Sequence, residues 1–203
     1  VIPITRHEVN LETDTSSEQI KNIIKPSSIV VLSAARSPAK TADDLYANMT
    51  IVENCISGLL HVKPTYILNI SSDAIFSDSK QKITEGYMTA PRNFHGIMHV
   101  MRETLLNQYF AGKIGHVRPT LVFGEKDPHN GYGPNSFLRK ARRGENICLF
   151  GLGEELRDHI YIEDVAKICA QMILKRRTRP LNAVSGSLCT FEDIAKKAQR
   201  FFH

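Results

Sequence analysis

Three short runs of apolar, largely β-branched residues predict the strands of a buried parallel sheet: residues 28–32, 66–70 and 117–123. Runs that stay apolar over this length are typical of strands covered on both faces. Between the runs, over residues 42–60 and 94–110, apolar positions recur every three or four residues, which predicts amphipathic helices. The order strand, helix, strand, helix, strand predicts a doubly wound α/β domain.

The rest of the chain predicts shorter elements on either side of this alternation. Residues 1–4 and 8–11 are expected to form two further strands, followed by a helix at 17–24. From Gly124 to Pro134, turn-forming residues predict a long loop, so we place a domain boundary near Gly124. The elements expected beyond it are a helix at 135–143, strands at 147–150, 158–162 and 181–184, and helices at 163–174 and 191–202, the last with Thr190 as its N-cap.

The composition narrows the class of protein. With 203 residues, 42% hydrophobic and 23% charged, the chain has an ordinary globular composition. Its apolar runs are too short to span a membrane. The four cysteines are scattered without a CxxC pair, which argues against a disulfide framework or a zinc site and favours a reducing cytoplasm. The net charge of +5 indicates either an anionic ligand or merely charged helix ends, and no nucleic-acid recognition motif accompanies it.

Four stretches, in this order and spacing, resemble the NAD-dependent epimerase/dehydratase family of extended short-chain dehydrogenase/reductases, which act on nucleotide sugars. They are residues 70–76 (ISSDAIF), 117–124 (VRPTLVFG), 127–135 (DPHNGYGPN) and 157–165 (RDHIYIEDV). The resemblance implies a Rossmann-like dinucleotide-binding domain over residues 1–123. It also implies a small C-terminal α/β lobe for the substrate over residues 124–203, with segments that return to the core.

The resemblance places the family's catalytic hydroxyl just past the strand at 66–70, at Ser72. There it would hydrogen-bond the substrate oxygen at the reacting carbon. The alternative is that Ser72 only completes a turn at the end of the strand. Asp73 matches a position that serves as an acid in sugar dehydratases. Ala74 stands where those enzymes have Glu, so 4,6-dehydration is less expected.

Two histidines occupy the positions of the family's catalytic tyrosine and lysine: His95 replaces the tyrosine and His99 the lysine. A neutral imidazole can act as a base near pH 7. It is shorter than a phenol, however, and a gap of about 1 Å can cost on the order of 100-fold in rate. At i and i+4 on one helix face, each imidazole opposes protonation of the other. A metal site at this pair and a plain loss of catalytic residues are the alternatives.

The resemblance also assigns residues to a bound NAD or NADP. Arg6 lies where the family contacts the adenosine ribose or a 2′-phosphate, and an arginine there favours NADP. Asn10 stands at an adenine-contacting position where the family more often has Asp. The choice between NAD and NADP stays open. The other positions matched to the dinucleotide are Leu11, Ala34, Ala35, Arg36, Asn48, Ile70, Pro119 and Thr120.

On the substrate side, the resemblance matches Asn135 and Arg157 to positions that bind the nucleotide sugar. A guanidinium fork at Arg157 suits the bidentate contact that the family makes with the substrate diphosphate. The alternative for Arg157 is a surface ion pair with Asp158 or Glu155. Members of the family commonly pair through a four-helix interface, which implies a homodimer built on the helices expected within residues 42–60 and 94–110.

The family's first strand and its glycine-rich turn have no match in this sequence. In a sheet of order 3-2-1-4-5-6 that strand is central, and without it its neighbours would expose apolar edges. We therefore expect roughly 25–30 residues, the size of a β-α unit, to precede Val1. We also expect the C-terminal lobe to continue beyond residue 203.

The sequence leaves two functions open. One is an NAD(P)-dependent nucleotide-sugar epimerase, dehydratase or reductase that acts by transient hydride transfer. The other is a catalytically impaired relative that binds a dinucleotide and has a regulatory or scaffold role. The presence of Ser72 favours the first, and the replacement of both catalytic side chains at His95 and His99 favours the second.

Overall fold

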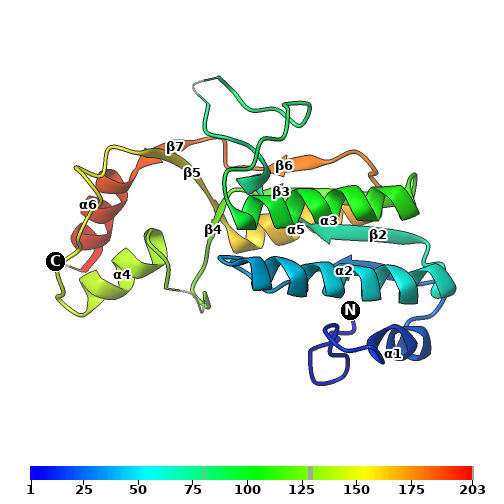
Figure 1. The fold of residues 1–203 in the computed structure, drawn as a ribbon. Helices are drawn as coiled ribbons and strands as arrows, with labels where there is room; N and C mark the ends of the chain where they lie inside the picture. The colour runs from blue at the N-terminus through cyan, green and yellow to red at the C-terminus, as the bar shows by residue number, and fades with distance from the viewer. Residues whose placement is uncertain (80, 128–129, 203) are drawn as a thin grey trace. The chain divides into compact units, whose positions relative to one another are not determined.

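The computed structural model describes residues 1–79, 81–127 and 130–202, and the chain divides into two compact units. The first unit comprises Val1–Arg118 and Cys169–Asn182, and the second comprises Pro119–Ile168 and Ala183–His203. Figure 1 shows the ribbon of both units and labels most of their helices and strands. Over the described residues, every helix is too short or too polar to cross a membrane.

The first unit is built on a sheet with the strand order β1-β2-β3-β6. Its strands are β1 (Ile29–Leu32), β2 (Tyr66–Ile70), β3 (Ile114–Pro119) and β6 (Leu181–Ala183). The pairs β1·β2 and β2·β3 are parallel, with Val30 opposite Ile67 and Ile67 opposite Ile114. The predicted parallel sheet and its α/β class are thus confirmed.

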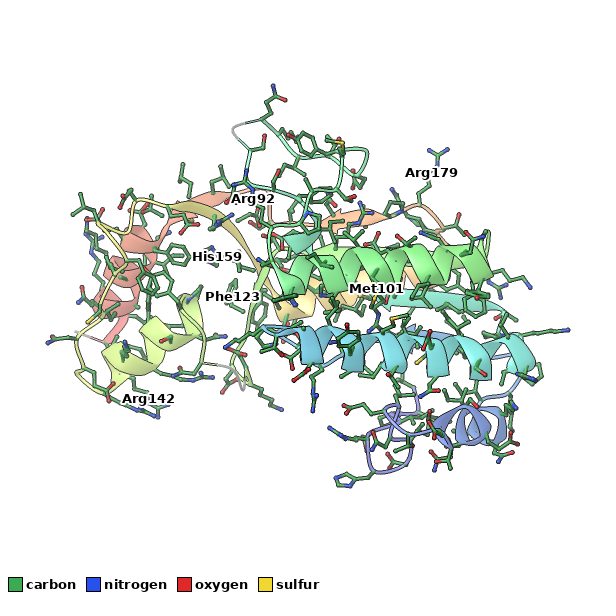
Figure 2. All side chains as sticks on the ribbon, in the orientation of Figure 1. Arg92, Met101, Phe123, Arg142, His159 and Arg179 are labelled. Atoms are coloured by element: carbon green, nitrogen blue, oxygen red, sulfur yellow. The ribbon has the colours of Figure 1, made fainter. Side chains whose placement is uncertain are left out.

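Two long helices run side by side across one face of this sheet (Figure 1). They are α2 (Ala42–Val62) and α3 (Phe94–Phe110). A capping box begins α2, because the Thr41 side chain accepts from the backbone N–H of Asp44 and the Asp44 carboxylate accepts from that of Thr41. Met101 of α3 lies beside α2 (Figure 2) and packs on the main apolar core, which includes the following buried residues: Val30, Leu32, Val52, Ile56, Leu59, Ile67, Leu106 and Ile114.

Helix α1 (Ser16–Ile23) packs against α2 through a close approach at Gly58. A Cβ at this glycine would lie 2.6 Å from the Cγ2 atom of Ile20, a distance that real contacts do not reach. Ile20 is buried in the same core as α2. The absence of a side chain at residue 58 therefore lets α1 reach the core.

The N-terminal strands expected at residues 1–4 and 8–11 are wrong, because both segments are coil and turn. Val1, Ile2 and Ile4 are exposed. The chain turns here because the Glu8 carboxylate accepts from the backbone N–H of Thr5, at 2.7 Å, while the Thr5 carbonyl accepts from the Val9 N–H. A short apolar run forms a strand only where a neighbouring strand is available to pair with it.

The run at 117–123 is also not one strand, since it divides at Thr120 between two sheets. β3 ends at Pro119, and β4 (Leu121–Phe123) pairs in parallel with β5 (Leu156–Tyr161). Thr120 fixes the break, because its N–H donates to the Ala183 carbonyl and its hydroxyl to the Asp158 carbonyl.

The second unit combines the sheet β4-β5-β7 with two packed helices. β7 (Leu188–Thr190) is antiparallel to β5, and the helices are α4 (Pro134–Arg142) and α6 (Phe191–Phe202). Thr190 caps α6 as predicted, accepting from the Asp193 N–H at 3.0 Å. The strand expected at 147–150 is wrong: Ile147 and Leu149 instead pack on the cluster around Phe137 as irregular chain. Helix α5 (Ile162–Leu174) contains residues of both units.

Candidate active site

Ser72 and Asp73 lie at the carboxyl end of β2, the end of a parallel strand where ligands bind in open α/β sheets. The chain leaves the sheet after Ser71, whose N–H donates to the Val117 carbonyl at 2.7 Å, and forms the 3₁₀ turn η1 (Asp73–Ile75). The Ser72 hydroxyl caps this turn: it accepts from the Ala74 N–H at 3.1 Å and donates to an Asp73 carboxylate oxygen at 3.3 Å. The turn-forming contact of Ser72 is therefore present.

The first turn of α3 is held against η1 at Gly96. Asn93 caps α3 by accepting from the Gly96 N–H at 2.9 Å. A Cβ at Gly96 would lie 2.1 Å from the carbonyl oxygen of Ala74. This approach brings His95 within electrostatic reach of Asp73, whose carboxylate acts to raise the pKa of the imidazole. The structure therefore brings Ser72, Asp73 and His95, which the resemblance matched to the family's catalytic positions, close to one another.

Gly96→Ala is expected to destabilise the first unit by about 2–3 kcal/mol, because the new methyl group would force α3 away from η1. Chemical denaturation followed by circular dichroism measures the change. Gly86→Ala is the matched control, since nothing lies within 4 Å of a Cβ at that glycine. Equal stability of the two variants would show that the contact between α3 and η1 is not tight.

His95 and His99 lie one turn apart on α3 with their rings edge to face, the centroids 4.7 Å apart. Burial lowers the pKa of His95 against the opposing charge of Asp73. Burial, His95 and Arg102 together lower the pKa of His99 to about 3, with Glu103 opposing them. Both imidazoles are thus neutral at pH 7. His99 supplies no positive charge there, in contrast to the lysine it replaces.

Each imidazole of this pair has an orphaned ring nitrogen. Within the described chain, Nδ1 of His95 and Nδ1 of His99 are buried and have no hydrogen-bond partner. A buried polar atom without a protein partner carries a desolvation cost, which a water molecule or a ligand can offset. The parts of the chain that the structure covers contain no group of three or more His, Cys, Asp or Glu that could hold a metal ion.

A buried polar layer underlies the histidine pair, and the sequence analysis did not identify it. The Asn69 side chain on β2 accepts from Arg102 Nε at 2.6 Å and lies 3.1 Å from Nδ1 of His116. Nε2 of His116 is 3.0 Å from the Asn107 oxygen. Because Arg only donates, the Asn69 oxygen faces it and the Asn69 amide donates to His116, which must carry its proton on Nε2. The signal for this layer was Asn69 inside the apolar run at 66–70 and His116 directly before the run at 117–123.

Most of the residues matched to the dinucleotide lie in the first unit, around the turn after β1. Asn48 of α2 is buried and fixes this turn through both backbone groups of Arg36, each at 2.9 Å. Arg6 and Arg36 both pair with Glu12, at 3.5 and 3.9 Å. Glu12 was not singled out from the sequence, although it follows the matched positions Asn10 and Leu11 directly. Ala34, Ala35 and Ile70 follow β1 or end β2, next to Ser71 and Ser72.

A cavity of about 670 Å³ opens beside the first turn of α3. His95 and Ile97 of α3 form part of its wall, as does Arg92, which Figure 2 labels in the loop before that helix. The remaining lining residues are Pro38, Ala39, Lys40, Asn93 and Phe94. His95 therefore borders a space large enough for part of a small-molecule ligand.

Pro119, Thr120, Asn135 and Arg157 belong to the second unit. Asn135 lies in the first turn of α4 and donates to an Asp127 carboxylate oxygen at 2.8 Å. Residues 128 and 129 of the matched stretch 127–135 lie outside the described residues. Arg157 pairs with Glu155 at 2.5 Å, the surface ion pair that the sequence left as an alternative.

The parallel sheet and the helices packed on it define a Rossmann-like α/β protein. A model of the NAD dependent epimerase/dehydratase family matches residues 2–184, and the chain belongs to this family. A curated relative, the low-salt glycan biosynthesis protein Agl12 of Haloferax volcanii, is 24% identical over 161 residues, 72% of this chain. The chain spans about half the length of that relative, 50%.

Solved structures with the same fold are nucleotide-sugar epimerases and related reductases. UDP-N-acetylglucosamine 4-epimerase from Bacillus cereus matches 94% of this chain, over 68% of its own, with a TM-score of 0.84 and 22% identity. UDP-glucose 4-epimerase from Thermotoga maritima, solved with UDP-glucose, matches 92% of this chain, over 65% of its own, with a TM-score of 0.78 and 20% identity. A dTDP-4-dehydrorhamnose reductase from Clostridium acetobutylicum matches 98%, over 70% of its own, with a TM-score of 0.82 and 17% identity.

Proposed function

We propose that this protein is an NAD(P)-dependent oxidoreductase or isomerase that acts on a nucleotide sugar by transient hydride transfer. The observation that carries the proposal is the family match over residues 2–184 together with the meeting of Ser72, Asp73 and His95 at the end of β2. The glycan biosynthesis role of the relative from Haloferax volcanii supports a sugar substrate.

The residues of the first unit fit a dinucleotide. Only methyl side chains follow β1 at Ala34 and Ala35, which leaves the backbone open to a close ligand. The orphaned Nδ1 of His99 is a partner for a ribose hydroxyl. When bound, the nicotinamide would supply the acceptor and donor for the hydride. NAD and NADP both remain candidates, because Glu12 pairs with Arg6 and Arg36 and offsets part of the positive charge that would favour a 2′-phosphate.

Two side chains would work on the sugar itself. The Ser72 hydroxyl would hydrogen-bond the sugar oxygen at the reacting carbon. Its own hydrogen bond to the Asp73 carboxylate would connect that carboxylate to the sugar oxygen. His95, neutral and beside the cavity, would accept the hydroxyl proton as that carbon becomes a ketone, and would return it in the reverse step.

His95→Ala is expected to lower turnover by about 100-fold or more, the loss typical of a missing general base. The measurement is conversion of a panel of UDP-, GDP- and dTDP-sugars with NAD or NADP by the full-length protein. His61→Ala, at an exposed histidine of α2, is the matched control. Wild-type turnover that His95→Ala leaves unchanged would exclude His95 as the base.

A non-catalytic dinucleotide-binding protein with a regulatory or scaffold role is the second candidate. The neutral imidazoles at both catalytic positions favour it, because neither a phenolate nor a fixed ammonium charge is available. Dinucleotide binding by wild type without turnover of any sugar, and turnover gained in His95→Tyr, would support this candidate over the first.

We also propose a homodimer for the complete protein. Helices α2 and α3 carry exposed apolar side chains, the arrangement that a helical interface requires. They include Tyr46, Met49, Leu60, Phe94, Ile97 and Tyr109.

A further inference from the structure

Arg102 is a buried cation in the middle of α3. The residue is only 4% exposed. The three guanidinium nitrogens, Nε, Nη1 and Nη2, each donate a hydrogen bond. Nε donates to the Asn69 oxygen at 2.6 Å, Nη2 donates to the Leu32 carbonyl at 3.1 Å, and Nη1 donates to the Ala34 carbonyl. All three acceptors are neutral groups.

No acidic side chain compensates this charge among the residues that the structure covers. The adjacent carboxylate, Glu103, is committed to Arg118 through two bonds of 2.9 and 2.6 Å. The thiol of Cys55 also interacts with Arg102, but burial raises the pKa of this thiol to about 11, so it is uncharged at neutral pH. Burial acts to lower the pKa of Arg102, but a guanidinium stays protonated in proteins. An unpaired buried charge is normally avoided, so its retention calls for a reason.

The position of Arg102 connects the two halves of the candidate site. It lies one turn beyond His99 on α3, three residues along the same helix face. The carbonyls that it binds, Leu32 and Ala34, belong to the end of β1 and to the turn that Asn48 holds from the other side. One side chain therefore joins the turn matched to the dinucleotide to the helix that carries the histidine pair.

We propose that Arg102 is a positioning residue that fixes the turn after β1 against α3 and places an uncompensated positive charge under the histidine pair, toward an anionic dinucleotide. The proposal rests on the proposed function in so far as it names a dinucleotide. Because guanidinium geometry satisfies three carbonyl-type acceptors at once, lysine could supply the charge at this position but not the whole set of bonds.

The charge of Arg102 has a direct consequence for the imidazole of His99. The charged and titratable groups that act on His99 are His95, Arg102 and Glu103, and Asp73 acts on His95. Of these, Arg102 and His95 favour the neutral form of His99 and Glu103 opposes it. Removal of the guanidinium charge leaves Glu103 less opposed, so the pKa of His99 should rise.

The first test is a titration of the histidine ring signals by NMR on the protein without a ligand. In Arg102→Gln, His99 is expected to protonate at higher pH than in wild type, whereas in Arg102→Lys it should stay near its wild-type behaviour. Lys113→Gln removes an exposed charge just after α3 and is the matched control. A His99 titration that is the same in all four proteins would overturn the proposal, and so would a rise in Arg102→Lys equal to that in Arg102→Gln.

The second test is the affinity for NAD measured by calorimetry. Arg102→Gln is expected to weaken binding by roughly 2- to 30-fold, the range for residues that couple two parts of a site, and Arg102→Lys by less. Wild-type affinity in Arg102→Gln would overturn the positioning role. If wild type itself binds no dinucleotide, the proposed function fails, while the titration still decides the electrostatic role of Arg102. If Arg102→Gln does not fold, Arg102→Lys carries the decision: it must keep the His99 titration and lose affinity.

Discussion

Replacement of Glu103 by alanine is expected to lower the free energy of unfolding by about 3–5 kcal/mol, the largest effect we expect from a single substitution in the first unit. The reason is the guanidinium of Arg118, which would be left buried without its counter-charge. The two side chains are only 9% and 8% exposed, and they share two hydrogen bonds. Arg118 has no easy escape to solvent, because it also donates to the Glu85 carbonyl and lies over the Phe76 ring at 5.4 Å.

Urea denaturation of the Glu103→Ala protein measures this loss. Glu192→Ala is the matched control, since it breaks the exposed pair between Glu192 and Lys196 and should cost at most about 1 kcal/mol. The double variant Glu103→Leu with Arg118→Met should recover much of the stability, because it removes both buried charges together. A loss below about 1 kcal/mol in Glu103→Ala would mean that the pair is far better solvated than its burial indicates.

The stability of the first unit is expected to fall steeply as the pH is lowered from about 6.5, the ordinary histidine pKa, toward 3. Burial lowers the pKa of His95, His99 and His116, and for His99 the value is about 3. In this window these imidazoles bind protons in the unfolded chain but not in the folded chain, so lowering the pH favours unfolding. Each such imidazole contributes up to about 1.4 kcal/mol per pH unit, and the contribution is absent above pH 6.5.

Unfolding free energies measured at several pH values between 7 and 4 provide the test. His99→Leu is expected to reduce the slope in this window, because the unfolded variant has one fewer imidazole that can bind a proton. His61→Ala, at an exposed histidine of α2, is the matched control. A slope that is unaffected by His99→Leu would show that His99 is protonated in the folded protein.

The elements of the first unit were largely predictable because their patterns are local. The strand at 66–70 has the predicted bounds, and the helices within 42–62 and 94–110 follow their apolar periodicity and their caps at Thr41 and Asn93. The strands expected at 1–4 and 8–11 failed because pairing depends on a neighbour that local sequence does not specify. The division at Thr120 failed for a related reason: an apolar run does not say which of two sheets each half joins.

The sequence predicted those residues of the candidate site that lie in or near the stretches matched to the family. The order and spacing of the matched stretches brought Ser72, Asp73, His95 and His99 into view, and the structure places the first three at the contact of η1 with α3. Arg102 was not predictable, since a charged residue on a helix is ordinarily solvent-exposed. Its burial depends on three acceptors from two segments, Leu32 and Ala34 at the end of β1 and Asn69 on β2, which meet only after the sheet has formed.

The buried polar layer on β2 and β3 also helps to set the register in which these two strands pair. Asn69 and His116 stand directly opposite each other in the parallel register, and their side chains hydrogen-bond across it. A slip of either strand by one residue would turn one polar side chain to the other face of the sheet and leave the other buried without its partner. Apolar neighbours such as Leu68 and Ile114 would tolerate such a slip far better. The two polar residues thus distinguish the correct alignment from its nearest competitors, and they do so in the segment that carries Ser72.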